Sequence, residues 1–141
     1  MPKILYVDDD VEMCHLMKST LNHGQFQVVA LSDPRQALDV GSQESFDILL
    51  TDYNMPWLNG LELIELLLEK QPRICPMIFS GAPPSTFIGA QVAGVIRKPA
   101  DLDKIQEQVL QIYRSFVSPH TQQRLRTLTD RINAWCDTVG E

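Results

Sequence analysis

Short apolar segments alternate with longer amphipathic segments along the first 117 residues. Short runs of β-branched and other apolar residues predict buried strands, whereas apolar residues three and four positions apart predict helices. The expected strands are residues 3–7, 26–31, 46–51, 77–79 and 95–96. The expected helices are residues 11–22, one that begins at Asp33-Pro34, residues 61–70, a short or distorted one within 85–92, and one with an apolar stripe from Leu102 to Phe116.

Residues that typically begin or end helices lie at the limits of the first two expected helices. Gly24 follows the first helix at a position that suits a left-handed end. Asp33 is a good N-cap, and Pro34 suits the first helical position. Five strand-then-helix units with short connections imply an α/β domain, a doubly wound five-stranded parallel sheet with helices on both faces. In such a sheet, ligands bind at the carboxyl ends of the strands.

Four of the expected strands end in reactive or charged residues. The first is followed by Asp8-Asp9-Asp10, the third by Asp52, the fourth by Ser80 and the fifth by Lys98. Two carboxylates about 4 Å apart repel by roughly 4 kcal/mol at an effective dielectric constant of 20. Mg²⁺ and a lysine ammonium would offset that repulsion. Asp8 or Asp10 alone is more typical of a helix cap than of a metal ligand, but the combination favours a site.

Composition and charge narrow the function classes. The chain has 141 residues, is 44% hydrophobic and 21% charged, and carries a net charge of −6, so direct nucleic-acid binding is not expected. Cys14, Cys75 and Cys136 lack the spacing of a zinc site and predict reduced thiols. No signal peptide precedes the first strand, and no apolar stretch approaches the ~20 residues needed to cross a bilayer. We therefore expect a cytoplasmic protein without a membrane partner.

Four short motifs together resemble the receiver domains of bacterial two-component response regulators, the CheY-like family. The resemblance covers about residues 2–117 and implies a flavodoxin-like sheet with strand order 2-1-3-4-5. We accordingly expect a receiver domain at 1–117 and a C-terminal helical extension at 118–141. The motifs are Asp52-Tyr53-Asn54-Met55-Pro56-Trp57-Leu58-Asn59-Gly60 (D-x-x-M-P-x-x-x-G), Val7-Asp8-Asp9-Asp10, Ser80-Gly81-Ala82 and Lys98-Pro99.

The resemblance also implies a role for each strand-end residue. Asp52 would accept the phosphoryl group from a histidine kinase or a histidine phosphotransfer protein. Asp9 and Asp52 would bind Mg²⁺ (or Mn²⁺) together with the backbone carbonyl of Asn54, and Asp8 would act through water or as a further ligand. Lys98 would contact the phosphoryl oxygens, and Ser80 would donate a hydrogen bond to one of them. The Lys98-Pro99 peptide is expected to be cis.

The sequence departs from the family between Ser80 and Lys98. This stretch is several residues short, and Pro83-Pro84 and Gly89 oppose a long helix. Val95 stands three positions before the lysine, where the family usually has an aromatic residue. Either the usual coupling of hydroxyl and aromatic side chain lacks one component, or Val95 simply packs and the switch works through other residues.

The segment after Pro119 predicts a further helix with an a/d-type stripe. The stripe covers barely two heptads, so packing back on the receiver and a homodimer or partner contact both stay open. Residues 118–141 have no net charge and are too few for a DNA-binding output domain. The stripe residues are Leu125, Leu128, Ile132, Trp135 and Val139.

Three functions fit these observations. The first is a phosphoacceptor domain, not an enzyme, that signals through an unknown downstream protein. The second is an interaction module that keeps the fold but acts without phosphorylation, which the shortened stretch and Val95 motivate. The third is a Mg²⁺-dependent aspartyl phosphohydrolase. Such enzymes usually place a second aspartate two residues after the nucleophile, and Asn54 lacks the carboxylate for that acid–base role.

Overall fold

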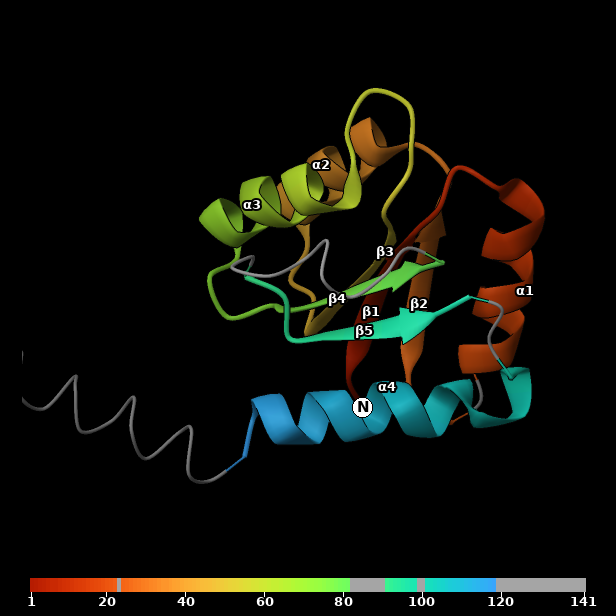
Figure 1. The fold of residues 1–141 in the computed structure, drawn as a ribbon. Helices are drawn as coiled ribbons and strands as arrows, with labels where there is room; N and C mark the ends of the chain where they lie inside the picture. Colours follow the sequence, from red (N-terminus) through yellow and green to blue (C-terminus); the bar gives the residue numbers. More distant parts are fainter. Residues whose placement is uncertain (23, 82–90, 99–100, 119–141) are drawn as a thin grey trace, which may run out of the picture.

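The computed structural model describes residues 1–22, 24–81, 91–98 and 101–118. Its strands form one parallel sheet in the order β2-β1-β3-β4-β5, which confirms the expected order (Figure 1). The strands are β1 (Lys3–Val7), β2 (Gln27–Leu31), β3 (Ile48–Asp52), β4 (Cys75–Ser80) and β5 (Gly94–Arg97). The helices are α1 (Val11–Leu21), α2 (Pro34–Gln43), α3 (Gly60–Lys70) and α4 (Leu102–Phe116).

The ends of the helices follow the capping residues in the sequence. Asp33 caps α2 by accepting a hydrogen bond from the backbone N–H of Arg35, and Pro34 is the first helical residue, as expected. Gly24 has a φ of 79°, the left-handed conformation that favours glycine. Asn59 and Glu62 form a reciprocal capping box at the start of α3. Capping residues therefore set where these helices begin and where the connecting loops end.

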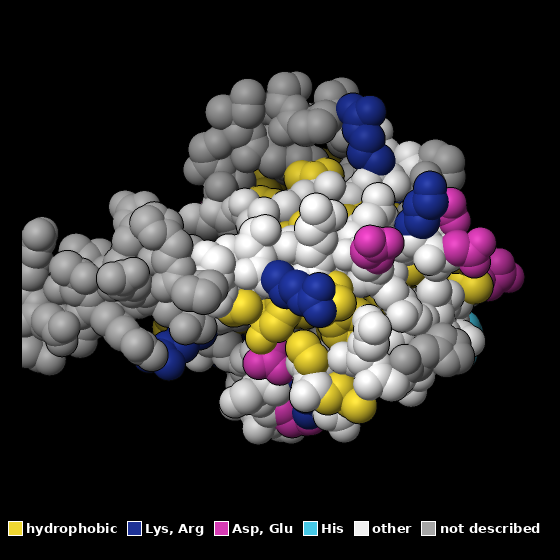
Figure 2. Space-filling view, turned by 90° about the horizontal axis from the view of Figure 1, so that it is seen from below, with side chains coloured by type: hydrophobic (Ala, Val, Ile, Leu, Met, Phe, Trp, Pro, Cys, Tyr) yellow, Lys and Arg dark blue, Asp and Glu magenta, His cyan; other side chains and the backbone are white. Residues whose placement is uncertain are grey.

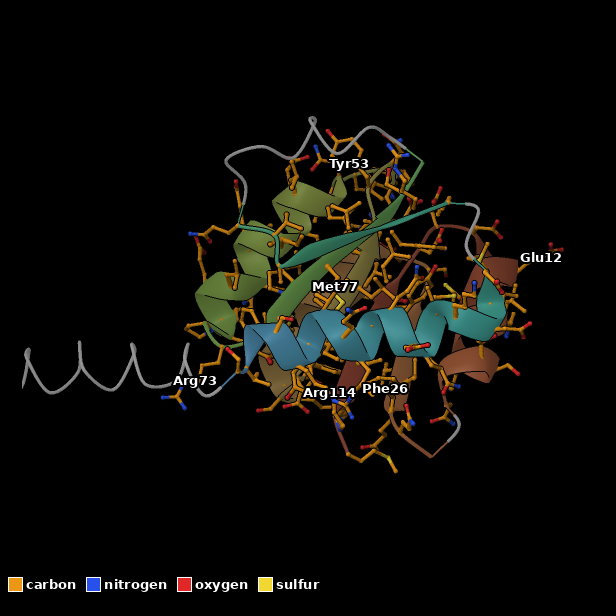
Figure 3. All side chains as sticks on the ribbon, turned by 60° about the horizontal axis from the view of Figure 1, so that its bottom comes forward. Glu12, Phe26, Tyr53, Arg73, Met77 and Arg114 are labelled. Carbon is orange, nitrogen blue, oxygen red and sulfur yellow. The ribbon has the colours of Figure 1, made fainter. Side chains whose placement is uncertain are left out.

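Alternating residues of the strands form two cores, one on each face of the sheet. Ile4 and Tyr6 of β1 point to the core covered by α1 and α4, whereas Leu5 and Val7 point to the core covered by α2 and α3. Figure 3 shows Met77 of β4 between the sheet and α4. The apolar stripe of α4 packs against this first core, as its spacing predicts.

The starts of β3 and β4 differ most from the sequence prediction, by two residues each, and the other strand limits agree within one residue. β3 begins at Ile48, because the preceding Phe46 donates its backbone N–H to the side chain of Gln71 instead of to a neighbouring strand. β4 begins at Cys75 and includes Pro76, whereas the prediction placed its start after Pro76, at Met77. Pro76 is tolerated near the start of the strand, and its carbonyl accepts a hydrogen bond from Ala93 N–H at 2.7 Å.

Several predicted features lie outside the described residues. They are residues 85–90 of the expected fourth helix, the Lys98-Pro99 peptide, Cys136 and the C-terminal stripe. Cys14 and Cys75 are free and buried, as expected for reduced thiols. None of the helices in the described part of the chain is long and apolar enough to span a bilayer.

Candidate functional site

The carboxyl ends of four strands bring the predicted residues together. Asp8 follows β1, Asp52 ends β3, Ser80 ends β4 and Lys98 follows β5. These strands are neighbours in the sheet, so residues up to 90 positions apart converge at one edge. Asp8 and Asp52 are only 1% and 9% exposed, which is unusual for carboxylates and points to a functional pocket, and Ser80 beside them is buried too.

Lys98 places its ammonium between the two buried carboxylates. Its Nζ lies 3.2 Å from Asp52 Oδ1 and 3.5 Å from Asp8 Oδ2. The same Nζ lies 5.0 Å from the ring centroid of Phe79, a cation–π distance. The backbone N–H of Lys98 donates to Ser80 O at 3.0 Å, which ties the end of β5 to the end of β4. Lys98 is therefore positioned by a hydrogen bond of its backbone and by ion pairs of its side chain.

Three carboxylates gather within reach of one cation. Oxygen atoms of Asp8, Asp9 and Asp52 all lie within 4.8 Å of one another. Together with the Lys98 ammonium they leave a local charge of −2, which matches one divalent cation. An all-oxygen set with Asp9 open to solvent suits Mg²⁺ or Mn²⁺, which keep several waters. The residues present therefore fit the expected metal.

Asp8 is fixed by hydrogen bonds to both of its oxygens. Oδ1 accepts from the backbone N–H of Asp10 at 3.0 Å, and Oδ2 accepts from the hydroxyl of Tyr6 at 2.8 Å. With Lys98 also at Oδ2, Asp8 has protein partners on each oxygen and serves to orient the pocket. Asp10 itself caps α1 by accepting from Glu12 and Met13, so it takes the cap role and not a place in the carboxylate cluster.

Tyr6 is a site residue that the sequence reasoning missed. It stands in an apolar strand and was expected only in the core, but its fully buried hydroxyl donates to Asp8. Two residues along a strand share one face of the sheet, and this period of two was the available signal. Burial, followed by the charge of Asp8, raises the pKa of the Tyr6 hydroxyl, so Tyr6 stays a donor at neutral pH.

Burial and neighbouring charges act together on the carboxyl group of Asp52. Its pKa is raised, first because burial disfavours the charged form and then because Asp8 is close, while Lys98 opposes the shift. Oδ1 also accepts the backbone N–H of Tyr53 at 2.8 Å. Oδ1 is thus shared between Lys98 and Tyr53, which orients the carboxyl group at the mouth of the pocket.

A glycine lets the loop after β3 close on Asp52. A Cβ atom on Gly60 would lie 2.5 Å from the carbonyl oxygen of Asp52, a contact that real Cβ atoms do not make. The backbone N–H of Gly60 donates to Tyr53 O at 2.8 Å. Asn54 lies exposed within this loop, so the loop brings the backbone of the expected metal ligand next to Asp52.

Val95 packs where the family usually has an aromatic residue. It lies in β5, is half-buried, and contacts the core under α2 and α3. Both alternatives for the switch, with or without a part for this position, stay predictions.

A family model and curated relatives both relate this chain to response regulators. Residues 4–110 match the family model described as response regulator receiver domain. The response regulator protein PilR of Pseudomonas aeruginosa is 30% identical over 111 residues, which cover 76% of this chain and 25% of PilR. The transcriptional regulatory protein CpxR of Escherichia coli is 41% identical over 78 residues, which cover 55% of this chain and 32% of CpxR.

A solved structure gives the same fold. The chemotaxis protein CheY4 of Vibrio cholerae matches with a TM-score of 0.73 and 21% identity, covering 79% of this chain and 98% of CheY4. The match to each of the two curated relatives spans only about a third or less of that relative's length. The likeness therefore concerns the domain and not the activities of those whole proteins.

Proposed function

The chain belongs to the response-regulator receiver family, and on that premise we propose that it accepts a phosphoryl group on Asp52. The donor would be the phosphohistidine of a histidine kinase or of a histidine phosphotransfer protein. The observation that carries the proposal is the ammonium of Lys98 between the buried carboxylates of Asp52 and Asp8, at 3.2 and 3.5 Å.

Phosphoryl transfer needs in-line geometry and positive charge around the equatorial oxygens. Lys98 supplies one positive charge, already beside the nucleophile. We assign Asp9, Asp52 and the backbone carbonyl of Asn54 to Mg²⁺ or Mn²⁺, with Asp8 acting through water or as a further ligand. The bound cation would neutralise phosphoryl oxygens that the carboxylates alone would repel.

We propose that Ser80 donates a hydrogen bond to the phosphoryl group and so senses it. It is buried at the end of β4, next to the backbone hydrogen bond that joins β4 to Lys98. A new anionic group on Asp52 would draw a hydrogen bond from the Ser80 hydroxyl and pull on the loop that follows.

The biological output of the domain would be protein–protein contact. We propose that 1–117 forms the receiver and 118–141 a helical extension, in a cytoplasmic protein that signals to a downstream protein. A homodimer through the C-terminal helix is an alternative way to use that extension. A separate hydrolase activity lacks support, because Asn54 offers no second carboxylate beside Asp52.

The test is phosphorylation by a small donor. The wild-type chain is incubated with acetyl phosphate and Mg²⁺, and intact-mass analysis counts the phosphoryl groups. We expect one phosphoryl group on the wild type and none on Asp52→Asn. Asp39→Asn, which removes an exposed carboxylate of α2, is the matched control and should be modified like the wild type.

Two further arms make the result decisive. Chelation of the cation and Lys98→Met should each strongly reduce the modification. A wild type that stays unmodified, or an adduct of equal yield on Asp52→Asn, would overturn the proposal. Multiple turnover of a phosphate ester would favour the hydrolase instead.

A further inference from the structure

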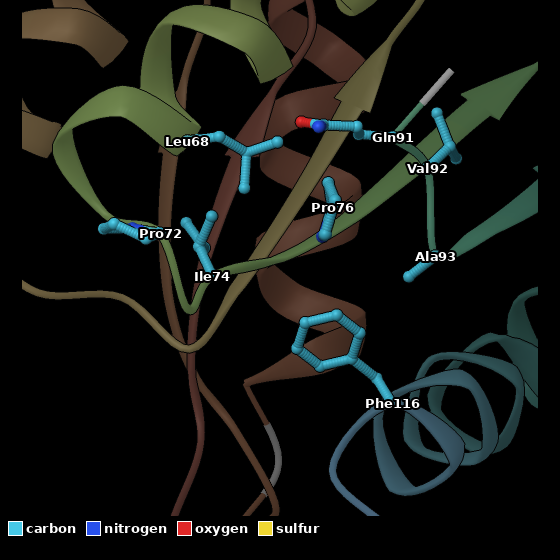
Figure 4. A pocket seen from close by; sticks show the side chains of 8 residues that line it. All are labelled: Leu68, Pro72, Ile74, Pro76, Gln91, Val92, Ala93 and Phe116. Carbon is cyan, nitrogen blue, oxygen red and sulfur yellow. The ribbon is translucent and has the colours of Figure 1, made fainter. Parts of the chain in front are cut away.

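An apolar groove lies at the amino ends of β4 and β5, at the opposite end of the sheet from the acidic pocket. Its lining includes Leu68 of α3, Ile74 before β4, Pro76 in β4 and Phe116 of α4 (Figure 4). The groove has a volume of about 460 Å³. An adjoining hollow of about 410 Å³ shares Ala93 and Phe116 with it, so the depression continues along α4.

The chemistry of the lining selects for an apolar occupant. None of the described residues that line either hollow is charged, and the polar ones are two glutamines and one serine. A charged small molecule would therefore find no counter-charge there. Seen from below, hydrophobic side chains show between the charged residues of the face that α4 forms (Figure 2). Apolar surface of this kind marks a site for another apolar surface.

The sequence beyond the groove supplies such a surface. Residues 119–141 carry the stripe described above, with Trp135 as its largest side chain. A helix of about 15 residues is only marginally stable by itself in water, and most of its stability in a protein comes from packing an apolar face. A tryptophan alone brings about 150–250 Å² of area to bury. The stripe therefore needs a partner surface.

The groove lies beside the point where the described chain leads into this segment. Phe116 lines both hollows, and α4 ends there. The six residues 119–124 separate Ser118 from Leu125, and six extended residues span about 20 Å. A short tether gives an effective concentration in the millimolar range, which favours docking within one chain over docking between two.

We infer that the stripe of residues 125–139 docks into this groove of its own chain. The contact buries the stripe against α3, the start of β4 and α4. It lies at the amino ends of the strands, whereas Asp8, Asp52 and Lys98 lie at the carboxyl ends. Docking of the stripe therefore does not require phosphorylation of Asp52.

The test reads the surroundings of Trp135 in the full chain. Trp57 is 69% exposed in the loop before α3, and Trp57→Phe leaves Trp135 as the single tryptophan. We expect blue-shifted emission and shielding from acrylamide. Ala93→Glu adds a carboxylate at an exposed residue shared by both hollows and should red-shift the emission and remove the shielding. Gln36→Glu, an exposed position of α2, is the charge-matched control and should change neither.

Each other outcome overturns the inference. Exposed Trp135 in the parent would show that the stripe is not docked. Shielding that persists in Ala93→Glu would place the stripe elsewhere. Shielding that appears only with rising concentration and a doubled mass in light scattering would make a second copy the occupant. Circular dichroism of both variants separates undocking of the stripe from loss of the fold. Truncation after Ser118 gives a second comparison of helix content.

Discussion

At the amino ends of the strands, charged groups find partners close to solvent. Lys3 Nζ contacts Glu44 Oε1, and Asp47 Oδ2 accepts the backbone N–H of Lys3 at 2.8 Å. At the carboxyl ends, the carboxylates of Asp8, Asp9 and Asp52 gather, and the ammonium of Lys98 contacts the two buried ones, Asp8 and Asp52. At the first edge each of these charged side chains has an ionic or hydrogen-bond partner, whereas at the second edge three carboxylates exceed one ammonium.

This difference in charge has opposite consequences for stability at the two edges of the sheet. Exposed pairs such as Lys3 and Glu44 add little to stability, because solvent screens them. Buried carboxylates without enough counter-charge lower stability unless a cation joins them. On the proposed function, the carboxyl edge lowers the stability of the metal-free protein and in return can bind a cation and a phosphoryl group.

The largest expected effect comes from removing the shared ammonium. Lys98→Met should lower the free energy of unfolding by about 2 kcal/mol in the presence of a chelator, because two buried carboxylates lose their partner. The value is below that of a fully buried pair, since Lys98 is 29% exposed. Urea denaturation measures it. Lys3→Met at the opposite edge is the control, and an equal loss there would remove the contrast between the two edges.

A smaller loss is expected at the hydroxyl that holds Asp8. Tyr6→Phe keeps the ring in the core but removes the 2.8 Å hydrogen bond to a buried carboxylate. A hydrogen bond to a charged group contributes about 1.5–3 kcal/mol, and Asp8 keeps Lys98 and the backbone N–H of Asp10 as partners. We therefore expect a loss near the lower end, about 1.5 kcal/mol, in urea denaturation. Tyr113→Phe, on the half-buried face of α4, is the matched control. Equal losses would mean that the hydroxyl of Tyr6 contributes nothing specific.

The third prediction, for Asp52→Asn, is a gain in the free energy of unfolding instead of a loss. The pKa of Asp52 is raised in the folded protein by burial and by Asp8, so the folded state binds more protons than the unfolded state above the ordinary pKa of aspartate. The stability contributed by this group therefore falls as the pH rises from that pKa through the raised one. Metal-free Asp52→Asn should be more stable than the wild type at neutral pH, by on the order of 1 kcal/mol.

Thermal unfolding at a series of pH values, with chelator, checks this sign. The stability difference between Asp52→Asn and the wild type should grow with pH and shrink when Mg²⁺ is added. A mutant that is less stable than the wild type at neutral pH would show that the carboxylates are already neutralised within the protein.

The smallest effect is expected at the amino edge. Glu44→Gln should change the free energy of unfolding by less than about 0.5 kcal/mol, because Glu44 is 48% exposed and its ion pair is screened. Chemical denaturation at low and high salt measures it. A larger or salt-independent loss would show that this edge also depends on its charges.

The sequence predicted the architecture because local signals agree with the tertiary ones. Alternating strands and helices, the cap at Asp33 and the left-handed Gly24 all have local causes. The strand ends then locate Asp8, Asp52 and Lys98, because parallel strands end at a common edge. The start of β3 was misplaced because Phe46 is fixed by Gln71, 25 residues away, which no local pattern reveals.

The supporting contacts of the site needed the structure. Tyr6 is indistinguishable from a core residue in an apolar strand until its hydroxyl is seen at Asp8. The ring of Phe79 beneath Lys98 depends on the pairing of β4 with β5. The way Lys98 divides its contacts between two carboxylates depends on distances that motif spacing does not contain.

Calorimetric titration of the metal-free protein with Mg²⁺ tests the central claim most directly. We predict one binding site in the wild type, strongly weakened in Asp9→Asn and in Asp52→Asn and unchanged in Asp39→Asn. Binding of equal strength in all four proteins, or no binding to the wild type, would contradict the claim that the carboxylates at this edge of the sheet are completed by a divalent cation.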